Sequence, residues 1–448
     1  MTQTDPKAGR RFVDPEQPRY DQQGEQGERS DAERVAAATH SFIHDFHADT
    51  AGYMESCVHC GLCAEACQFY VQTKDPQYTP IHKIKPFKRA YQREVGPFAW
   101  LKKLTTKAVT LDELREWQHL IYDSCTMCGR CTMVCPMGID IPSLISAARH
   151  GMWAAGLAPA RLAQIVGNAE RNEGSQSANP KEFAAAIARM SETQGIEFPL
   201  DLPEADVLVT LSAGTIESDG AEVAAIHRIL TAAGYSYTFS THGYEATNFG
   251  MLSGYTELQK HYTLRIVDAA ERCKAKFVLL PECGHAYGAL RWEGPNWYGK
   301  PFPFAVLHMT EFLGQIVREK KIKLRKAGDA YGKVTYHDPC QAARRGGIYD
   351  APREVIAALG LPLEELRENK EYNWCCGGGG GALANKRNVP LRKEVFQIKI
   401  RQVEETGADT VVSACHQCHI TFEQGRAAHH WDTPFESLME LVAHHLET

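Results

Sequence analysis

The chain has 448 residues, 44% of them hydrophobic and 23% charged, and its 49 basic and 55 acidic residues leave a formal net charge of −6. A length of this order predicts two or three domains, each large enough for its own core. The nearly balanced charge argues against nucleic acid and against direct binding to an anionic membrane. No apolar stretch approaches the roughly 18 residues that a membrane-spanning helix needs. We therefore expect a membrane to be reached only through a partner subunit.

The N-terminal residues 1–35 are rich in Gln, Asp, Glu, Arg and Gly, which predicts a disordered tail. The tail has no apolar core of the kind found in secretory signals, and no such core follows the pair Arg10-Arg11. The whole chain contains 15 cysteines. In a protein that is not secreted, this number indicates metal sites rather than disulfides. The sequence therefore predicts a cytoplasmic metalloprotein.

Residues 36–155 are expected to form a helical domain around two cysteine runs. Each run has the spacing C-x2-C-x2-C-x3-C of bacterial ferredoxins, in which three thiolates bind one [4Fe–4S] cluster and the fourth reaches the other cluster. The predicted ligands are Cys57, Cys60, Cys63 and Cys135 for the first cubane cluster, and Cys125, Cys128, Cys131 and Cys67 for the second. A pair of zinc sites is the alternative interpretation.

Helices are predicted on both sides of the second run. The 57 residues between the runs contain an apolar stripe made of Leu111, Leu114, Trp117, Leu120 and Ile121. Thr110 and Glu113 precede this stripe as a capping box, and Asp140 is placed to cap a helix over residues 143–150. The first run has Gln68 where proline is common, which affects turn geometry more than ligation. Residues 156–203 are helical and polar and are expected to form a linker.

The remaining residues predict two α/β halves, 204–330 and 331–448, with the same order of elements. The expected strands are 207–212, 235–240, 277–280, 334–337 and 410–414, and the expected helices are 222–233, 264–272, 350–360 and 395–405. This repetition indicates two units packed about a pseudo-twofold axis. The expected fold class is α + α/β, a helical domain followed by a pseudo-repeated pair.

Five cysteines of the second half form three groups. Cys340 follows His337-Asp338-Pro339, the pair Cys375-Cys376 precedes a glycine run over 377–381, and Cys415 and Cys418 are three residues apart. Five thiols are too many for an ordinary four-thiolate site, and adjacent cysteines suit a cluster with several metal atoms. Glycines beside them let the backbone approach such a cluster. Buried structural cysteines are one alternative. Covalent haem c on Cys415-His416-Gln417-Cys418-His419 is another, but it requires export.

This cysteine pattern resembles the CCG domain of the heterodisulfide reductase family. The gaps here are 34 residues before Cys375 and 38 residues after Cys376, and the longer second gap is interpreted as a loop insertion. The resemblance implies one non-cubane [4Fe–4S] cluster held by five thiolates. It also implies that residues 36–155 are an α-helical ferredoxin domain. Because only one half carries the five cysteines, the chain is more similar to the HdrD- and DsrK-type subunits, including those of sulfur-oxidising systems, than to two-cluster subunits.

The first half lacks the five cysteines and keeps Glu282-Cys283-Gly284-His285 after its third strand. Cys283 is predicted to be a redox thiol at the carboxyl end of that strand, with His285 or Glu282 moving its proton. A buried remnant of a lost site is the alternative. We expect Cys273 to be structural.

Three further residues have two interpretations each. Arg344 with its neighbour Arg345 could bind an anion or form a plain turn. His416 and His419 could donate to cluster sulfur or be ordinary solvated residues.

The resemblance implies a catalytic iron–sulfur subunit that couples thiol and disulfide chemistry to one-electron transfer through the two cubane clusters. The chain has no GxGxxG fingerprint, so flavin or NAD is expected on another subunit. Expected partners are other reductase-like subunits and a sulfur carrier, either DsrC-like or lipoate-binding. The alternatives are an electron-relay subunit of a lactate- or glycolate-oxidising flavoprotein complex and a scaffold with a purely structural cluster.

Overall fold

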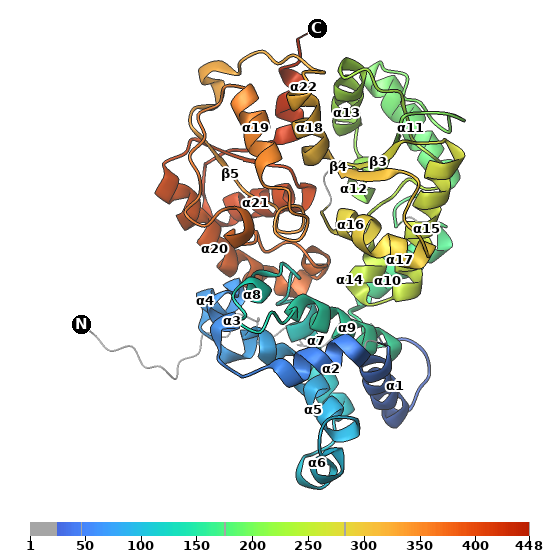
Figure 1. Ribbon diagram of the computed structural model, residues 1–448, viewed down its shortest axis with the longest axis vertical. Helices are drawn as coiled ribbons and strands as arrows, with labels where there is room; N and C mark the ends of the chain where they lie inside the picture. The colour runs from blue at the N-terminus through green and yellow to red at the C-terminus, as the bar shows by residue number, and fades with distance from the viewer. Residues whose placement is uncertain (1–24, 46, 174–175, 282–283, 448) are drawn as a thin grey trace, which may run out of the picture. The chain divides into compact units, whose positions relative to one another are not determined.

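The computed structural model describes residues 25–447 except 46, 174–175 and 282–283. The chain divides into two compact units (Figure 1). Unit 1 contains residues 1–164, 251–256 and 374–399, and unit 2 contains residues 165–250, 257–373 and 400–448. Segment 374–399, which carries Cys375 and Cys376, therefore belongs to the unit with the two cysteine runs. The sequence predicted five parts, 1–35, 36–155, 156–203, 204–330 and 331–448, and this division stays a prediction.

Unit 1 is helical and is built around the packing of α1 against α9 and of α7 against α9. Its helices are α1 (Asp31–His44), α2 (His47–Ser56), α3 (Leu62–Glu65), α4 (Gln68–Thr73), α5 (Lys85–Glu94), α6 (Ala99–Thr105), α7 (Leu111–Tyr122), α8 (Arg130–Met133) and α9 (Ile141–Ala154). Helices α10 (Ala160–Arg171), α14 (Phe249–Ser253) and α20 (Val389–Thr406) continue from one unit into the other. No helix in the described part of the chain is both long and apolar enough to cross a membrane.

The first helix begins at Asp31, before the position expected from the apolar pattern. Ser30 and Glu33 form a reciprocal capping box that fixes this start. Arg34 is buried and donates hydrogen bonds to the carbonyls of Gln26, Gly27 and Ala155. The described end of the predicted tail is thus held by polar contacts, which an apolar pattern does not reveal. Residues 1–24 lie outside the described part of the chain.

The helix before the second run forms where predicted, but only the Thr110 half of the predicted capping box is present, since the Glu113 carboxylate pairs with Arg89. The Thr110 hydroxyl accepts a hydrogen bond from the Glu113 amide, and four members of the apolar stripe are buried while Trp117 is half-buried. Helix α9 follows Asp140 but begins at Ile141 and runs to Ala154, so it is longer than expected. Asp140 accepts a hydrogen bond from the Ser143 hydroxyl rather than from a backbone amide of the first turn.

Unit 2 contains two small parallel sheets among helices. The first sheet has the order β2-β1-β3-β4, from β1 (Val207–Val209), β2 (Tyr237–Thr238), β3 (Phe277–Leu280) and β4 (Ala305–His308). The second has the order β5-β6-β7, from β5 (Val334–Tyr336), β6 (Thr410–Ser413) and β7 (Phe435–Ser437). Every strand pair in both sheets is parallel. The mostly helical chain with small parallel sheets is compatible with the predicted α + α/β class.

The helices of unit 2 connect and cover these strands. They are α11 (Pro180–Gln194), α12 (Ala213–Glu217), α13 (Ala221–Ala232), α15 (Thr256–Arg272), α16 (Gly284–Gly288), α17 (Gly294–Tyr298), α18 (Met309–Arg318), α19 (Asp350–Ala358), α21 (His416–His429) and α22 (Leu438–His444). One core cluster contains residues of both sheets, such as Val207 and Val412. Helix α11 lies in the predicted linker, but its Phe183, Ile187 and Met190 are fully part of this core.

Candidate iron–sulfur sites

The two cysteine runs adopt the same backbone conformation. His59 and Met127, at equivalent positions, have φ values of 55° and 56°, and Gly61 and Gly129 have φ values of 83° and 78°. A four-residue helix follows each glycine, α3 in the first run and α8 in the second. Two closely spaced residues with positive φ bend the chain so that neighbouring cysteines can face a common centre. The repeated sequence pattern therefore produces a repeated loop.

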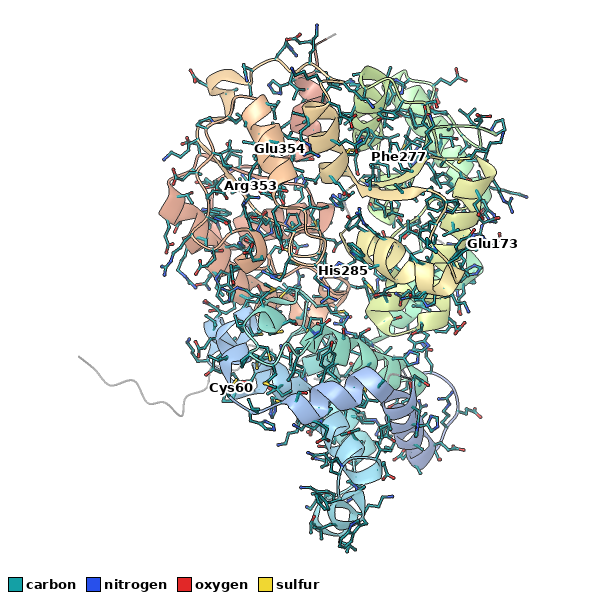
Figure 2. All side chains as sticks on the ribbon, viewed as in Figure 1. Cys60, Glu173, Phe277, His285, Arg353 and Glu354 are labelled. Carbon is teal, nitrogen blue, oxygen red and sulfur yellow. The ribbon has the colours of Figure 1, made fainter. Side chains whose placement is uncertain are left out.

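The first predicted ligand set lines one cavity. Cys57, Cys60 and Cys63 of the first run share this cavity with Cys135, the last cysteine of the second run. Isoleucines 81, 139 and 141 also line it. Cys60, labelled in Figure 2, is exposed. The crossed set of four thiols is thus brought together at a site that opens to solvent.

The four cysteines of the second predicted ligand set are all half-buried, and none is exposed. Burial raises the pKa of Cys131 well above its usual value, and the neighbouring charges of Cys128, Cys125 and Cys67 raise it further. Cys67 is the last cysteine of the first run, so the crossing is reciprocal. The chemistry of this half-buried, thiol-rich donor set fits an iron–sulfur cluster, which needs deprotonated sulfur ligands.

A buried lysine lies beside the second ligand set. Lys83 is 2% exposed, and its Nζ is 3.7 Å from Cys67 Sγ and also donates to the Ser124 carbonyl. Burial raises the pKa of Cys125, and the positive charges of Lys83 and Arg149 oppose this rise. An ammonium group in this position favours negative charge on the surrounding sulfurs.

Arg149 is fully buried in α9 and connects the second run to two other segments. Its guanidinium donates to the carbonyls of Ile121, Cys125, Leu252 and Gly380, at distances between 2.7 and 3.2 Å. Among the described residues, none of its hydrogen bonds goes to a carboxylate. A buried cation without such a partner is costly unless another negative charge is near. Burial lowers the pKa of Arg149, and the negative charges of Cys125, Tyr122 and Asp123 oppose this change.

Cys375 and Cys376 are buried in unit 1 and are contacted by the glycine run that follows them. The Gly377 amide is 3.4 Å from Cys375 Sγ, and the Gly378 amide is 3.5 Å from Cys376 Sγ. Backbone N–H groups directed at sulfur stabilise thiolate character. Two glycines of the run therefore bring backbone amides to sulfur.

The end of the glycine run packs against the loop of the second cysteine run. A Cβ atom on Gly380 would lie 2.7 to 2.9 Å from backbone atoms of Thr126, and Gly380 has a φ of 64°. Cys375 Sγ is 3.4 Å from the Thr126 hydroxyl oxygen. Because Thr126 directly follows Cys125, the Cys-Cys-Gly segment touches the ligand loop of the second set. Glycine is needed here for approach to protein backbone, a reason that the sequence did not reveal.

Polar contacts and an aromatic contact hold segment 374–399 in the same unit. The Arg130 guanidinium lies 3.5 Å from the centre of the Trp374 ring, which is a cation–π contact. Asn385 Nδ2 donates to Asp123 Oδ1 at 2.9 Å, and Arg387 pairs with the same carboxylate. Residues beside the second cysteine run therefore bind and stabilise the segment that carries Cys375 and Cys376.

The other three cysteines of the CCG pattern lie in unit 2, beyond the ends of two neighbouring strands. Cys340 follows β5, Cys415 follows β6 and precedes α21, and Cys418 lies in the first turn of α21. Because β5 and β6 are parallel and paired, their carboxyl ends meet at one edge of the sheet, where α/β units place their ligands. A ring nitrogen of the buried His337 lies within 4.8 Å of Cys418 Sγ.

A network around Asp338 fixes the loop between β5 and Cys340. Arg353, labelled in Figure 2, donates two hydrogen bonds to the buried Asp338 carboxylate, at 2.8 and 2.9 Å, and also pairs with Glu365. Asn373 Nδ2 donates to the Asp338 carbonyl at 2.6 Å. Asp338 was named in the sequence as part of the motif before Cys340, but its partners Arg353 and Asn373 were not.

The remaining predicted residues have mixed outcomes. Glu282 and Cys283 lie outside the described residues, and His285 is half-buried in α16. Arg344 is buried and donates to the carbonyls of Glu371 and Asn373, so it orders the segment before Cys375. Cys273 is buried in the apolar cluster beside β3, which fits its structural interpretation.

The two histidines of the Cys-x-x-Cys-His stretch lie in α21 of unit 2, and both contact residues of the same unit. His416 lines a small cavity with Ser212 and Glu222, where burial lowers its pKa. The His419 ring packs 4.9 Å from that of Phe435.

Comparison with known proteins adds two domain matches. Residues 53–139 match a 4Fe-4S dicluster domain, and residues 334–423 match a cysteine-rich domain, CCG. The chain is 28% identical over 404 residues to the HdrD-type subunit of the dihydromethanophenazine:CoB–CoM heterodisulfide reductase of Methanosarcina barkeri, covering 87% of this chain and 93% of the relative. This chain is an HdrD-like iron–sulfur protein.

Two further relatives of the HdrD-like chain belong to quinone-linked proteins. It is 25% identical to the Hdr-like menaquinol oxidoreductase iron–sulfur subunit of Archaeoglobus profundus, over 78% of this chain and 70% of the relative. It is 28% identical to the EtfAB:quinone oxidoreductase of Syntrophomonas wolfei, over 84% of this chain and 56% of the relative. These relatives are oxidoreductases or their subunits, which identifies the HdrD-like chain as an oxidoreductase component.

Proposed function

We propose that the HdrD-like chain is the catalytic iron–sulfur subunit of a heterodisulfide-reductase-like complex in the cytoplasm. It would couple thiol and disulfide chemistry to one-electron transfer. The observation that carries the proposal is the packing of Cys375 and Gly380 on Thr126 in the second cysteine run. This contact makes the second ligand set a neighbour of the proposed reaction site within one unit.

The proposed clusters follow the predicted ligand sets. The two crossed sets would hold cubane [4Fe–4S] clusters, and Cys340, Cys375, Cys376, Cys415 and Cys418 would hold one non-cubane cluster. When bound, the non-cubane cluster would supply a site for substrate sulfur that exchanges single electrons with the cubanes. Covalent connectivity supports the five-thiol set, because Asn373 is bound to the Asp338 carbonyl and only one residue separates it from Cys375.

The chain's own residues have distinct proposed roles. The amides of Gly377 and Gly378 would hold the two adjacent sulfurs in place and favour their thiolate form. His337 would orient Cys418, and Asp338 with Arg353 would fix the loop that presents Cys340. Cys283, assisted by His285 or Glu282, would serve as an additional redox thiol.

The two α/β parts of unit 2 are proposed to be a pseudo-repeat with one degenerate site. Their strand orders support this proposal. Strand β1 lies between β2 and β3, and β5 lies between an isolated bridge at Leu363 and β6. Both sheets then add one further parallel strand, β4 or β7. The first part has no counterpart of the five cysteines, so it would support the site rather than bind the cluster.

The physiological substrate is proposed to be a protein-borne disulfide, persulfide or dithiol, carried by a DsrC-like or lipoate-binding protein. Flavin would be located on another subunit. The test measures disulfide-dependent oxidation of a reduced viologen dye by the anaerobically purified protein. Cys375→Ala should lower the rate at least about a hundredfold, the range found when a covalently acting group is removed. Cys273→Ala is the matched control and should leave the rate unchanged.

Electron relay is the second candidate function, and the similarity to the EtfAB:quinone oxidoreductase favours it. In a relay subunit the CCG cluster would only pass electrons between partner proteins. The wild-type protein would then oxidise the dye with a quinone-linked partner present but not with a disulfide alone. Wild-type rates that do not respond to any disulfide would contradict the catalytic proposal and favour the relay.

A further inference from the structure

The α5–α6 hairpin of unit 1 carries an exposed apolar tip. The tip consists of Val95, Phe98, Trp100, Leu101 and Leu104. Phe98, Trp100 and Leu104 are 71%, 69% and 79% exposed, and α6 has no buried residue. Figure 1 shows α6 projecting beyond the other helices of this unit. Clustered large apolar side chains on a surface indicate a site of interaction.

The hairpin is well formed although its tip is exposed. The Gly96 amide bonds to the Tyr91 carbonyl at 2.9 Å and closes the turn after α5. Arg93 donates to the carbonyls of Lys103 and Thr106 at the end of α6. A seven-residue helix is unstable alone, so these contacts hold a surface whose apolar side chains have no covering partner among the described residues.

The charge of the hairpin differs from that of the chain. Residues 85–107 contain seven basic side chains and a single acidic one, Glu94, within a protein whose formal net charge is −6. Lys103 pairs with Glu94 at 2.9 Å and Arg89 pairs with Glu113, while Lys85 and Lys107 are exposed. The total charge of the chain does not reveal this local excess of basic residues. For that reason the composition alone argued against binding to an anionic membrane.

The apolar side chains and the lysines of α6 lie on different sides of the helix. Leu104 is four residues after Trp100 and three after Leu101, so these three side chains lie on one side of the helix, and Phe98 precedes them just before the helix begins. Lys102 and Lys103 lie between them in sequence and so point elsewhere. A short helix with Trp, Phe and Leu on one side and Lys on the other is typical of segments that lie in a membrane interface. Anionic lipid headgroups attract such lysines.

We propose that the α5–α6 hairpin binds directly to an anionic lipid bilayer. The apolar tip would enter the boundary between headgroups and acyl chains, while Lys85, Lys102 and Lys107 would contact phosphate groups. The proposal does not depend on the sulfur chemistry proposed above. It places the protein at the membrane surface.

Flotation of the anaerobically purified full-length protein with lipid vesicles tests the proposal. One set of vesicles contains equal parts of phosphatidylcholine and phosphatidylglycerol, and the other contains phosphatidylcholine alone. The wild type should float with the anionic vesicles and bind neutral vesicles at least about fivefold more weakly. Trp100→Ala/Leu104→Ala should weaken binding to anionic vesicles at least about tenfold, because two apolar side chains leave the interface.

Matched variants test whether vesicle binding depends on the tip itself or on exposed apolar and basic residues anywhere on the surface. Trp292→Ala/Leu202→Ala removes an exposed Trp and an exposed Leu from unit 2 and should bind like the wild type. Lys102→Gln/Lys107→Gln should weaken binding to anionic vesicles at least about tenfold, whereas Lys181→Gln/Lys320→Gln should not. Protein that fails to float with either kind of vesicle would overturn the proposal, and the tip would then be a surface for a protein partner. Equal binding by the tip and control variants would also overturn it.

Discussion

The two cysteine runs have the same backbone but different surroundings. In the first run the cavity opens to solvent and Cys60 is exposed, and Val58, Leu62 and Met137 are exposed beside it. In the second set all four cysteines are half-buried, and the nearby groups are Lys83, Arg149 and the glycine run. Local sequence therefore determines the ligand loop, whereas tertiary contacts determine what the loop faces.

If both ligand sets hold clusters as proposed, this difference would give electron transfer between them a direction. The first site is accessible to a partner protein, and the second contacts the Cys-Cys-Gly segment. Buried positive charge beside the second set should raise the reduction potential of a cluster bound there, because it stabilises the more negative reduced form. Electrons entering at the first site would then pass to the second and on to Cys375 and Cys376.

The largest expected effect is a loss of unfolding free energy when Arg149, which hydrogen-bonds to segments around the second ligand set, is replaced. Arg149→Met keeps most of the side-chain volume but leaves carbonyls of Ile121, Cys125, Leu252 and Gly380 without their donor. We expect a loss of about 3–5 kcal/mol of unfolding free energy, measured by anaerobic denaturation in urea. The control Arg115→Met removes a partly exposed ion pair and should cost no more than about 1 kcal/mol. Equal losses would contradict the role assigned to Arg149.

A pair of glycine variants separates close approach from backbone strain. Gly380 and Gly138 both have a φ of 64°, but a Cβ on Gly380 meets the Thr126 backbone, whereas one on Gly138 meets no atom within 4 Å. Gly138→Ala should cost about 1–2 kcal/mol from strain. Gly380→Ala should cost about 2–4 kcal/mol because overpacking is added. Equal midpoint shifts in urea denaturation would show that segment 374–399 does not pack on the second run.

A smaller effect is expected on reduction potential. Lys83→Met should lower the potential of the second cluster by on the order of 100 mV, because a charge near Cys67 Sγ is lost. Lys88→Met is the matched control beside the first run, since Lys88 contacts His59 on the exposed side. Solvent screens that charge, so the first cluster's potential should change little. A redox titration followed by electron paramagnetic resonance measures both, and unchanged potentials in Lys83→Met would contradict the assignment.

The sequence predicted the ferredoxin-type loops and their crossed ligand sets because the spacing of the cysteines is local information. Helix α7 was also predictable, since its cap and apolar stripe lie within one segment. Strands β4 and β7 were missed because they are partly exposed edge strands and lack the continuous buried run that β1, β3, β5 and β6 have. The core role of α11 was missed because its polar face dominates its composition.

Long-range contacts account for the parts of the site that sequence did not reveal. Arg149 resembles an ordinary polar residue of an amphipathic helix, and nothing nearby in sequence indicates that it reaches Gly380. Lys83 lies 16 residues from Cys67 and its burial depends on the packing of several helices. Thr126 was passed over as a spacer between cysteines. Each of these roles exists only after folding brings separate segments together.

The most direct test of the account is electron paramagnetic resonance of oxidised, anaerobically purified protein with and without a small thiol, combined with an iron count. Three four-iron clusters predict about 12 irons per chain. We expect a paramagnetic signal that appears only with thiol, persists in Cys273→Ala and disappears in Cys375→Ala, where about 8 irons should remain. A thiol-dependent signal that survives Cys375→Ala, or its absence from protein with about 12 irons, would contradict the account.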